Sequence, residues 1–176
     1  AFVSLYFYKA YLPILALRAG VPIFDIGVFL GTQELVSALA RPVCGKLADR
    51  HDRALFLAGG LAATGGLIIG VPAFLENGRY MELAILLGAA QAVVQPALQA
   101  MISSGPEKVL ALSFGVVGSF RNAGKVAGPA AGGLLLAVTD VNTCFLITGI
   151  PTVLLGAWLF AGQLARRRRL PNEAES

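Results

Sequence analysis

Four ionisable residues interrupt stretches of the sequence that are otherwise apolar. They are Lys9, Glu34, Arg121 and Lys125. A charged side chain at the centre of a membrane helix costs at least roughly 2.5–3.5 kcal/mol on insertion scales, so such groups face a polar cavity or a partner. At about 1.5 Å per residue, Arg121 lies about 20 Å from the polar boundary near residue 108, and Lys125 lies about one turn further on. These charges mark a candidate binding site.

Two kinds of chemistry fit these charges. One is a buried salt-bridge network, such as Glu34 with Arg121, that only holds helices together. The other is a site for a substrate or a coupling ion. Low-dielectric surroundings favour the neutral form of an isolated carboxyl group, which would let Glu34 carry a proton, whereas basic neighbours oppose this. Other side chains that could add hydrogen bonds in such a site are Gln91, Gln95, Gln33, Asn122, Tyr6, Tyr8 and Tyr11.

The stretch that contains Arg121 also carries a packing motif. Gly124, Gly128 and Gly132 recur every four residues, which places three positions without side chains on one helix face. This pattern of small residues lets two helix backbones approach closely in a membrane. Pro129 lacks an amide hydrogen and should bend the helix near Gly128. We therefore predict that this helix packs tightly against a neighbour.

Six apolar stretches must position these residues. The chain has 176 residues, of which 56% are hydrophobic and 14% are charged, whereas soluble domains carry about 25% charged residues. About 20 apolar residues are enough to cross the hydrocarbon layer as a helix. We predict an all-α membrane protein. Its six-helix domain at 1–165 has spans at about 1–17, 26–44, 54–75, 80–102, 109–138 and 143–164, and a basic and polar tail follows at 166–176.

The charges outside the spans predict how the chain is oriented. Basic residues gather in alternate connections, at 45–53 and at Lys108, and again at 166–169 in the tail. This is the positive-inside pattern, which places those segments and both ends of the chain in the cytoplasm. The net charge of +4 belongs to this pattern and not to a soluble nucleic-acid-binding face. The chain opens at Ala1 without signal-peptide features, and we expect its N-terminal side to be missing.

A weak internal repeat relates the second and fifth spans. Residues 40–47, "ARPVCGKL", and residues 127–134, "AGPAAGGL", share the pattern Ala-x-Pro-x-x-Gly-x-Leu. The two spans run in opposite directions because an even number of spans, the third and the fourth, lies between them. Inverted repeats of this kind build secondary transporters. We therefore expect two inverted three-helix repeats.

The connection at 45–53, "GKLADRHDR", resembles a loop signature of the major facilitator superfamily. Gly45, Asp49, Arg50 and Arg53 match the pattern Gly-x-Leu-x-Asp-Arg-x-Gly-Arg, between the second and third helices of a six-helix unit. The resemblance implies that Asp49 pairs with Arg50 and Arg53 and latches neighbouring helices in one access state. It also implies that Gly45 allows tight packing.

Other parts of the chain extend this resemblance. Residues 124–133, "GKVAGPAAGG", fit the pattern Gly-x-x-x-Gly-Pro-x-x-Gly-Gly of the fifth helix in many facilitator-family antiporters. Asp52 and Ala54 depart from the loop signature, where Gly and a second basic residue are usual; Asp tolerates left-handed backbone better than most residues. In this family the third helix of each triplet is peripheral, which suits the uncharged third and sixth spans. The whole chain thus resembles half of a twelve-helix transporter. Its basic tail and its departures from the loop signature favour the C-terminal half, whereas the glycine-proline pattern is best known from the N-terminal half.

The resemblance implies a secondary active transporter in the plasma (inner) membrane. It would move a small solute by alternating access, as proton-coupled efflux. We expect no enzyme activity, cofactor or metal, because His51 is the only histidine and has no cluster of ligands around it. The expected partners are the solute, protons, the lipid bilayer and the missing half of the same chain, and not nucleic acid. A polytopic scaffold or sensor with the same fold is the alternative, in which the charges inside the spans are only structural.

Overall fold

The computed structural model describes residues 2–50, 52–103 and 107–173, with side chains placed for 2–50, 52–103 and 110–165. His51, the side chain of Lys108 and the side chains of the arginines at 166–169 lie outside this description. The charges that decide the predicted orientation are therefore only partly visible, and the orientation stays a prediction.

All regular secondary structure in the described residues is helical. Six helices lie at the positions of the six predicted spans, which confirms the predicted all-helical fold. Four helices are long and apolar enough to cross a membrane by length and composition: α2, α3, α4 and the Val141–Ala165 part of α6. The helices are α1 (Phe2–Arg18), α2 (Ile23–Arg50), α3 (Arg53–Glu76), α4 (Tyr80–Ser103), α5 (Glu107–Val138) and α6 (Val141–Glu173).

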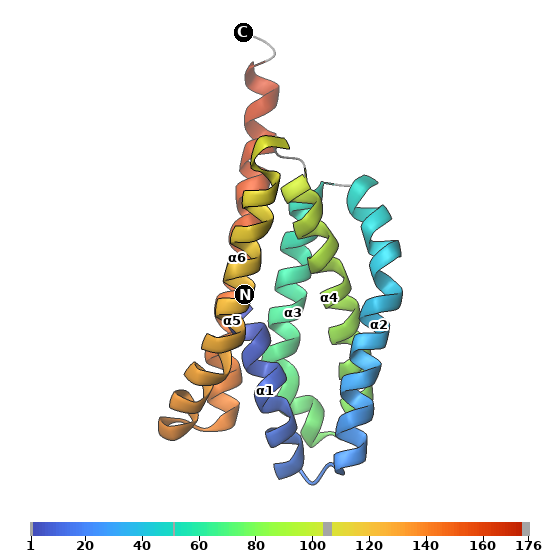
Figure 1. The fold of residues 1–176 in the computed structure, drawn as a ribbon, viewed down its shortest axis with the longest axis vertical. Helices are drawn as coiled ribbons and strands as arrows, with labels where there is room; N and C mark the ends of the chain where they lie inside the picture. The colour runs from blue at the N-terminus through green and yellow to red at the C-terminus, as the bar shows by residue number, and fades with distance from the viewer. Residues whose placement is uncertain (1, 51, 104–106, 174–176) are drawn as a thin grey trace.

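The helices pack in pairs that join the first and second halves of the chain (Figure 1). Helix α1 runs along α5, α2 runs along α4, and α3 runs along α6 and also contacts α4. If α1, α2 and α3 are exchanged for α4, α5 and α6 in that order, the pair α1–α5 becomes α4–α2, the pair α2–α4 becomes α5–α1, and α3–α6 becomes itself. The same three pairs therefore result. This is the symmetry expected of two three-helix repeats, and it agrees with the predicted fold class.

The bundle has two distinct ends (Figure 1). We call the end where α2, α4 and α6 finish the inner end, and the end where α1, α3 and α5 finish the outer end. The inner end is the one that the sequence predicts to be cytoplasmic. Helix α1 begins well away from the inner end, beside α5, so it accompanies only part of that helix.

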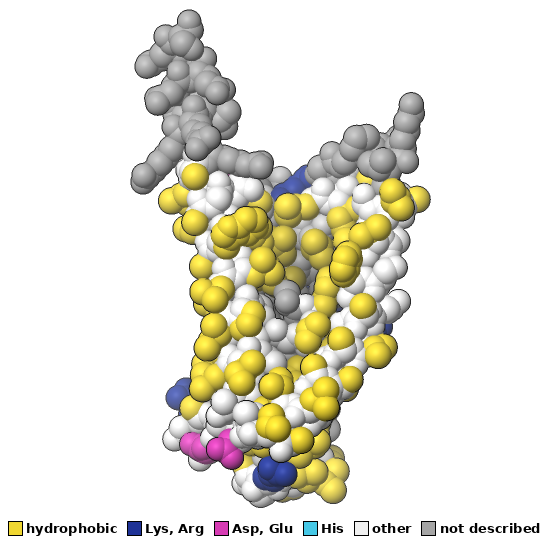
Figure 2. All heavy atoms as spheres, turned by 90° about the vertical axis from the view of Figure 1, so that its left-hand side faces the viewer, with side chains coloured by type: hydrophobic (Ala, Val, Ile, Leu, Met, Phe, Trp, Pro, Cys, Tyr) yellow, Lys and Arg dark blue, Asp and Glu magenta, His cyan; other side chains and the backbone are white. Residues whose placement is uncertain are grey.

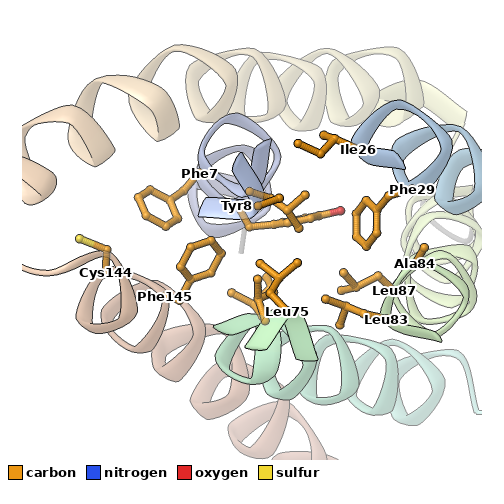
Figure 3. Close-up of a cluster of buried hydrophobic side chains, with 14 residues drawn as sticks. Phe7, Tyr8, Ile26, Phe29, Leu75, Leu83, Ala84, Leu87, Cys144 and Phe145 are labelled. Carbon is orange, nitrogen blue, oxygen red and sulfur yellow. The ribbon is translucent and has the colours of Figure 1, made fainter. Parts of the chain in front are cut away.

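A hydrophobic core fills the outer half of the bundle (Figure 3). Phe7 of α1, Phe29 of α2 and Phe145 of α6 are almost completely buried in it, together with leucines of α3 and α4. The ring of Phe7 meets the ring of Phe145 edge to face, with centroids 5.5 Å apart. Because helices in lipid associate through close packing, this core is what holds the outer half shut.

The glycine face of α5 lies directly against α1, which confirms the predicted packing. A Cβ atom at Gly128 would lie 2.9 Å and 3.0 Å from backbone atoms of α1. One at Gly124 would lie 2.8 Å from Phe2, and one at Gly132 would lie 2.1 Å from the ring of Tyr11. These distances are too short for a side chain, so the three glycines set how closely the two helices approach.

Pro129 lies on the same side of α5. The hydroxyl group of Tyr11 donates a hydrogen bond to the carbonyl oxygen of Pro129 at 2.7 Å, which ties α1 to α5. Helix α5 continues through Pro129 without a break. The predicted bend near Gly128 stays a prediction.

The other helix pairs are also packed through glycines, which the sequence analysis did not single out. A Cβ atom at Gly65 of α3 would lie 2.8 Å from the backbone nitrogen of Val153 on α6. One at Gly156 of α6 would lie 2.7 Å from the backbone of α3, and one at Gly88 of α4 would lie 2.6 Å from a carbonyl oxygen of α2. Each of the three pairs therefore brings two backbones into contact at glycine.

Two helices extend beyond the predicted spans. Helix α2 continues to Arg50 and α3 begins at Arg53, so most of the 45–53 motif forms the last turns of α2 and not a loop. Helix α6 continues to Glu173 and includes most of the predicted tail. Basic side chains are favourable at a helix C-terminus, where the backbone dipole is negative, so the charge of the 45–53 motif does not end α2.

Candidate functional site

A cavity of about 430 Å³ lies between the hydrophobic core and the inner end. The space-filling view shows the molecule hollowed from the inner end, between walls that are largely hydrophobic (Figure 2). Five of the six polar residues predicted for a binding site line this cavity, and they come from four helices. They are Lys9 of α1, Glu34 of α2, Gln91 and Gln95 of α4, and Arg121 of α5.

An ion pair joins α1 to α2 at the cavity wall. The Lys9 ammonium group contacts the Glu34 carboxylate. The Lys9 side chain is 30% exposed and the Glu34 side chain is 54% exposed, so the pair faces the cavity and not the core. The suggested pairing of Glu34 with Arg121 is wrong. Depth along the helices placed Glu34 and Arg121 at similar levels, but the rotation of each helix decides which charges meet.

Arg121 has a different and uncharged partner. Its Nη2 donates to the Oε1 atom of Gln95 at 2.8 Å, which links α5 to α4. Its Nε is buried and has no hydrogen-bond partner among the described residues. A buried donor left without a partner costs about 1–3 kcal/mol. Arg121 therefore carries one buried donor that no described residue satisfies.

Arg41 is a cavity residue that the sequence analysis missed. It lies on α2 within the predicted span 26–44, and it lines the same cavity as Arg121. Its Nη2 donates to the Oγ of Ser37 at 3.3 Å. The signal was available, because a charge inside a predicted span is the same observation that identified Glu34.

Helices α3 and α6 also line the cavity, which corrects the expectation that they are only peripheral. Thr64 and Ile68 of α3 and Thr152 of α6 contribute to the lining, with leucines from both helices. The hydroxyl group of Thr64 donates to the carbonyl oxygen of Gly60 at 2.8 Å, within its own helix. A span without charges can therefore face a cavity, because apolar and hydroxyl side chains make up much of this wall.

A buried hydrogen-bond network lies between the cavity and the core. Tyr8 of α1 is fully buried, and its hydroxyl oxygen accepts hydrogen bonds from the amide groups of Gln91 of α4, at 2.6 Å, and of Gln33 of α2. The Gln33 Oε1 atom has no partner among the described residues. Three helices thus meet at one hydroxyl group at the base of the cavity.

Lys125 is the predicted site residue that the structure places outside the cavity. It is exposed, and its ammonium group lies 5.8 Å from the centre of the Tyr6 ring. Arg121 lines the cavity and Lys125 does not, although the two residues lie one helical turn apart. The expectation that both cations share one cavity face is not met.

The 45–53 motif forms an ion pair and a bond between helices at the inner end. The Nη2 atom of Arg53 lies 3.4 Å from Oδ1 of Asp49, and its Nη1 donates to the carbonyl oxygen of Ala100 near the end of α4 at 3.0 Å. Arg53 therefore connects the ends of α2, α3 and α4. A Cβ atom at Gly45 would lie 3.9 Å from the nearest atom, in Pro96, so the close packing implied at Gly45 is absent.

Asp52 has a specific role where the family usually has Gly. Its side chain accepts hydrogen bonds from the backbone nitrogens of Ala54, at 3.0 Å, and Leu55, at 3.4 Å, and so caps the start of α3. Its φ of −64° is an ordinary backbone conformation. The turn therefore does not use the left-handed conformation considered from the sequence.

The described residues contain no group of three or more His, Cys, Asp or Glu side chains that could hold a metal ion. The polar groups of the cavity are two guanidinium groups, an ammonium–carboxylate pair, two amides and the hydroxyl groups of Tyr6, Thr64 and Thr152. Such groups bind and orient charged or hydrogen-bonding solutes.

The whole chain matches a family of known proteins. The Major Facilitator Superfamily profile matches residues 1–176. The multidrug resistance protein MdtG of Salmonella heidelberg is 29% identical over 151 residues, which cover 85% of this chain and 37% of MdtG. The MdtG protein of Dickeya zeae is 31% identical over 155 residues, which cover 86% of this chain and 38% of that protein.

A second group of relatives has a similar extent. The multi-drug resistance efflux pump PmrA of Streptococcus pneumoniae is 29% identical over 128 residues, which cover 72% of this chain and 32% of PmrA. The chain thus spans about a third of the length of the relatives it matches. No solved structure matches it.

Proposed function

Because the chain belongs to the Major Facilitator Superfamily, we propose that it is one six-helix half of a secondary active transporter that moves a small solute by alternating access. It is an integral membrane protein. The observation that carries the proposal is the cavity, where charged and amide side chains from α1, α2, α4 and α5 converge inside an apolar bundle. Such groups are costly in a membrane and mark a substrate or ion pathway by default.

The two ends of the bundle differ in the way that alternating access requires. The outer half is closed by the aromatic core, and the inner half is hollow. This arrangement corresponds to a state open toward the inner end, which we propose to be the cytoplasmic side. The contact of Arg53 with Asp49 and with the end of α4 is formed in this state, and we propose it as the latch that stabilises the state open toward the inner end.

We propose protons as the coupling ion and Glu34 as the residue that carries them. Glu34 is the one carboxylate among the described residues that line the cavity, and its charge is balanced by Lys9 of a different helix. Protonation of Glu34 would remove this attraction between α1 and α2. A proton arriving at Glu34 can thereby change how the two helices hold together.

The names of the relatives favour efflux, because MdtG is called a multidrug resistance protein and PmrA an efflux pump. We therefore propose export across the plasma (inner) membrane, with both ends of the chain in the cytoplasm. We place the chain in the C-terminal half of the transporter, as its basic tail predicts. The other six-helix half, the lipid bilayer, the solute and protons are then its partners.

The experiment is a flux assay with the full-length protein in proteoliposomes under an imposed proton gradient, using a panel of drugs, sugars and organic anions. The variants are Glu34→Gln, Lys9→Gln and the double variant. Glu82→Gln is the matched control, because Glu82 also forms an exposed ion pair, with Arg79, but lies near the outer end of α4. We expect gradient-dependent flux in the wild type and the control, and its loss in Glu34→Gln.

The double variant separates transport from a structural role. It removes both charges together and leaves no unpaired charge, so a merely structural ion pair would allow normal flux. Coupling through Glu34 predicts that the double variant stays inactive although it folds. Absence of gradient-dependent flux for every solute would instead favour the scaffold or sensor.

A further inference from the structure

We propose that the cavity binds an organic anion, held by the guanidinium groups of Arg41 and Arg121. This inference rests on the proposed function and names its class of substrate.

The cavity carries an excess of positive charge. Its ionisable lining consists of Lys9, Arg41 and Arg121, which are cationic, and Glu34, which is anionic. Lys9 and Glu34 neutralise each other in an ion pair. Neither Arg41 nor Arg121 forms an ion pair with a carboxylate of the described residues. Two positive charges therefore face the cavity without an anion.

The unused donors suit an oxyanion. Arg121 has its Nη2 bonded to the amide oxygen of Gln95, a neutral partner, and its buried Nε has no partner in the described part of the chain. Among the residues that the structure describes, the hydrogen-bond partner of Arg41 is the hydroxyl group of Ser37, at 3.3 Å. A guanidinium group presents donors in a planar fork that matches carboxylate, phosphonate and sulfonate groups, and such charge-assisted bonds are the strong ones.

The rest of the wall suits an apolar body. Phe2, Tyr6 and Phe120 and several leucines line the same cavity of about 430 Å³. A solute with an aromatic or alicyclic body and one anionic group would cover this surface and offset the two charges. A cationic solute of the same shape would instead meet two like charges in low-dielectric surroundings, where repulsion is strong.

Two probes with one ring system test the charge preference. They are 2-naphthalenesulfonate and 2-naphthyltrimethylammonium, which keep their charges at every working pH. Binding to the purified full-length protein is measured by isothermal titration calorimetry. We expect the sulfonate to bind at least tenfold more tightly than the ammonium, because only the sulfonate can pair with Arg41 and Arg121.

Variants then assign the binding to the two arginines. Arg41→Gln and Arg121→Gln should each weaken sulfonate binding at least tenfold, and Arg121→Lys should weaken it less because the charge is kept. Arg79→Gln is the control, because Arg79 is paired with Glu82 near the outer end. Tighter binding of the ammonium, no binding of the sulfonate, or sulfonate binding in both Gln variants as tight as in the wild type overturns the proposal. The second of these results is expected if carboxylates of the other six-helix half pair with the arginines.

The flux assay keeps this inference separate from the proposed function. Gradient-driven flux of the ammonium without sulfonate binding would overturn the anion site and leave transport standing. Sulfonate binding that depends on Arg41 and Arg121, with no flux of any solute, would support the anion site and overturn transport.

Discussion

Two adjacent glycines on α3 allow a sharp test of the helix packing. A Cβ atom at Gly65 would lie 2.8 Å from the backbone nitrogen of Val153 and 3.1 Å from the carbonyl oxygen of Gly149, both on α6. A Cβ atom at Gly66 would meet no described atom within 4 Å. Gly65→Ala must therefore push α3 and α6 apart, whereas Gly66→Ala adds a methyl group to open space at nearly the same depth.

The size of the effect follows from two opposing contributions. Alanine is favoured over glycine inside a helix by about 0.8–1.0 kcal/mol, and this gain applies equally to both variants. Overpacking a close contact costs about 1–3 kcal/mol, and this cost applies only at Gly65. The free energy of unfolding of Gly65→Ala should therefore be lower than that of Gly66→Ala by about 1–3 kcal/mol.

The assay is unfolding of the full-length protein in mixed micelles by titration with sodium dodecyl sulfate. Both variants are measured beside the wild type, and gradient-driven flux is measured on the same preparations. Gly66→Ala should be at least as stable as the wild type. Equal unfolding free energies for the two variants would refute the close backbone contact between α3 and α6.

Three further substitutions test the cavity base and the inner end. Tyr8→Phe leaves the amide groups of Gln33 and Gln91 without their buried acceptor and should lower the free energy of unfolding by about 1–3 kcal/mol; an unchanged unfolding curve in mixed micelles would contradict this network. Asp52→Ala removes the cap of α3 and should cost about 1 kcal/mol, while Asp52→Asn should cost much less; equal losses would exclude the capping role. Arg53→Gln weakens the contacts that stabilise the state open toward the inner end and should slow the labelling, from that side, of a cysteine placed in the cavity by a water-soluble reagent; unchanged or faster labelling would argue against the latch.

The sequence predicts the elements of this fold well because lipid imposes a simple requirement. A helix must stay apolar for about 20 residues to cross the hydrocarbon layer, and the six apolar stretches are long enough to stand out. The packing of Gly124, Gly128 and Gly132 is also predictable, because their spacing alone places them on one helix face. The glycines of α3 and α6 carry no such regular pattern, and only the structure shows Gly65 against Val153.

The helix ends and the partners of charged groups were harder to predict. Polar residues such as Asp49 and Arg50 look like a loop in the sequence, yet a helix continues beyond the hydrocarbon layer at no cost when its last turn is basic. The pairing of Glu34 with Lys9, and the exposure of Lys125, depend on the rotation of each helix about its axis. That rotation is set by contacts with neighbouring helices, which a single sequence does not display.

The central claim is that the charged cavity is the transport path. The most direct measurement compares gradient-driven solute flux in proteoliposomes that contain the full-length wild-type protein with flux in proteoliposomes that contain Arg121→Ala at equal folded amounts. The account predicts flux that requires the proton gradient in the wild type and disappears in the variant, because Arg121 lines the cavity and bonds to Gln95 at its wall. Undiminished flux in a folded Arg121→Ala protein would contradict it.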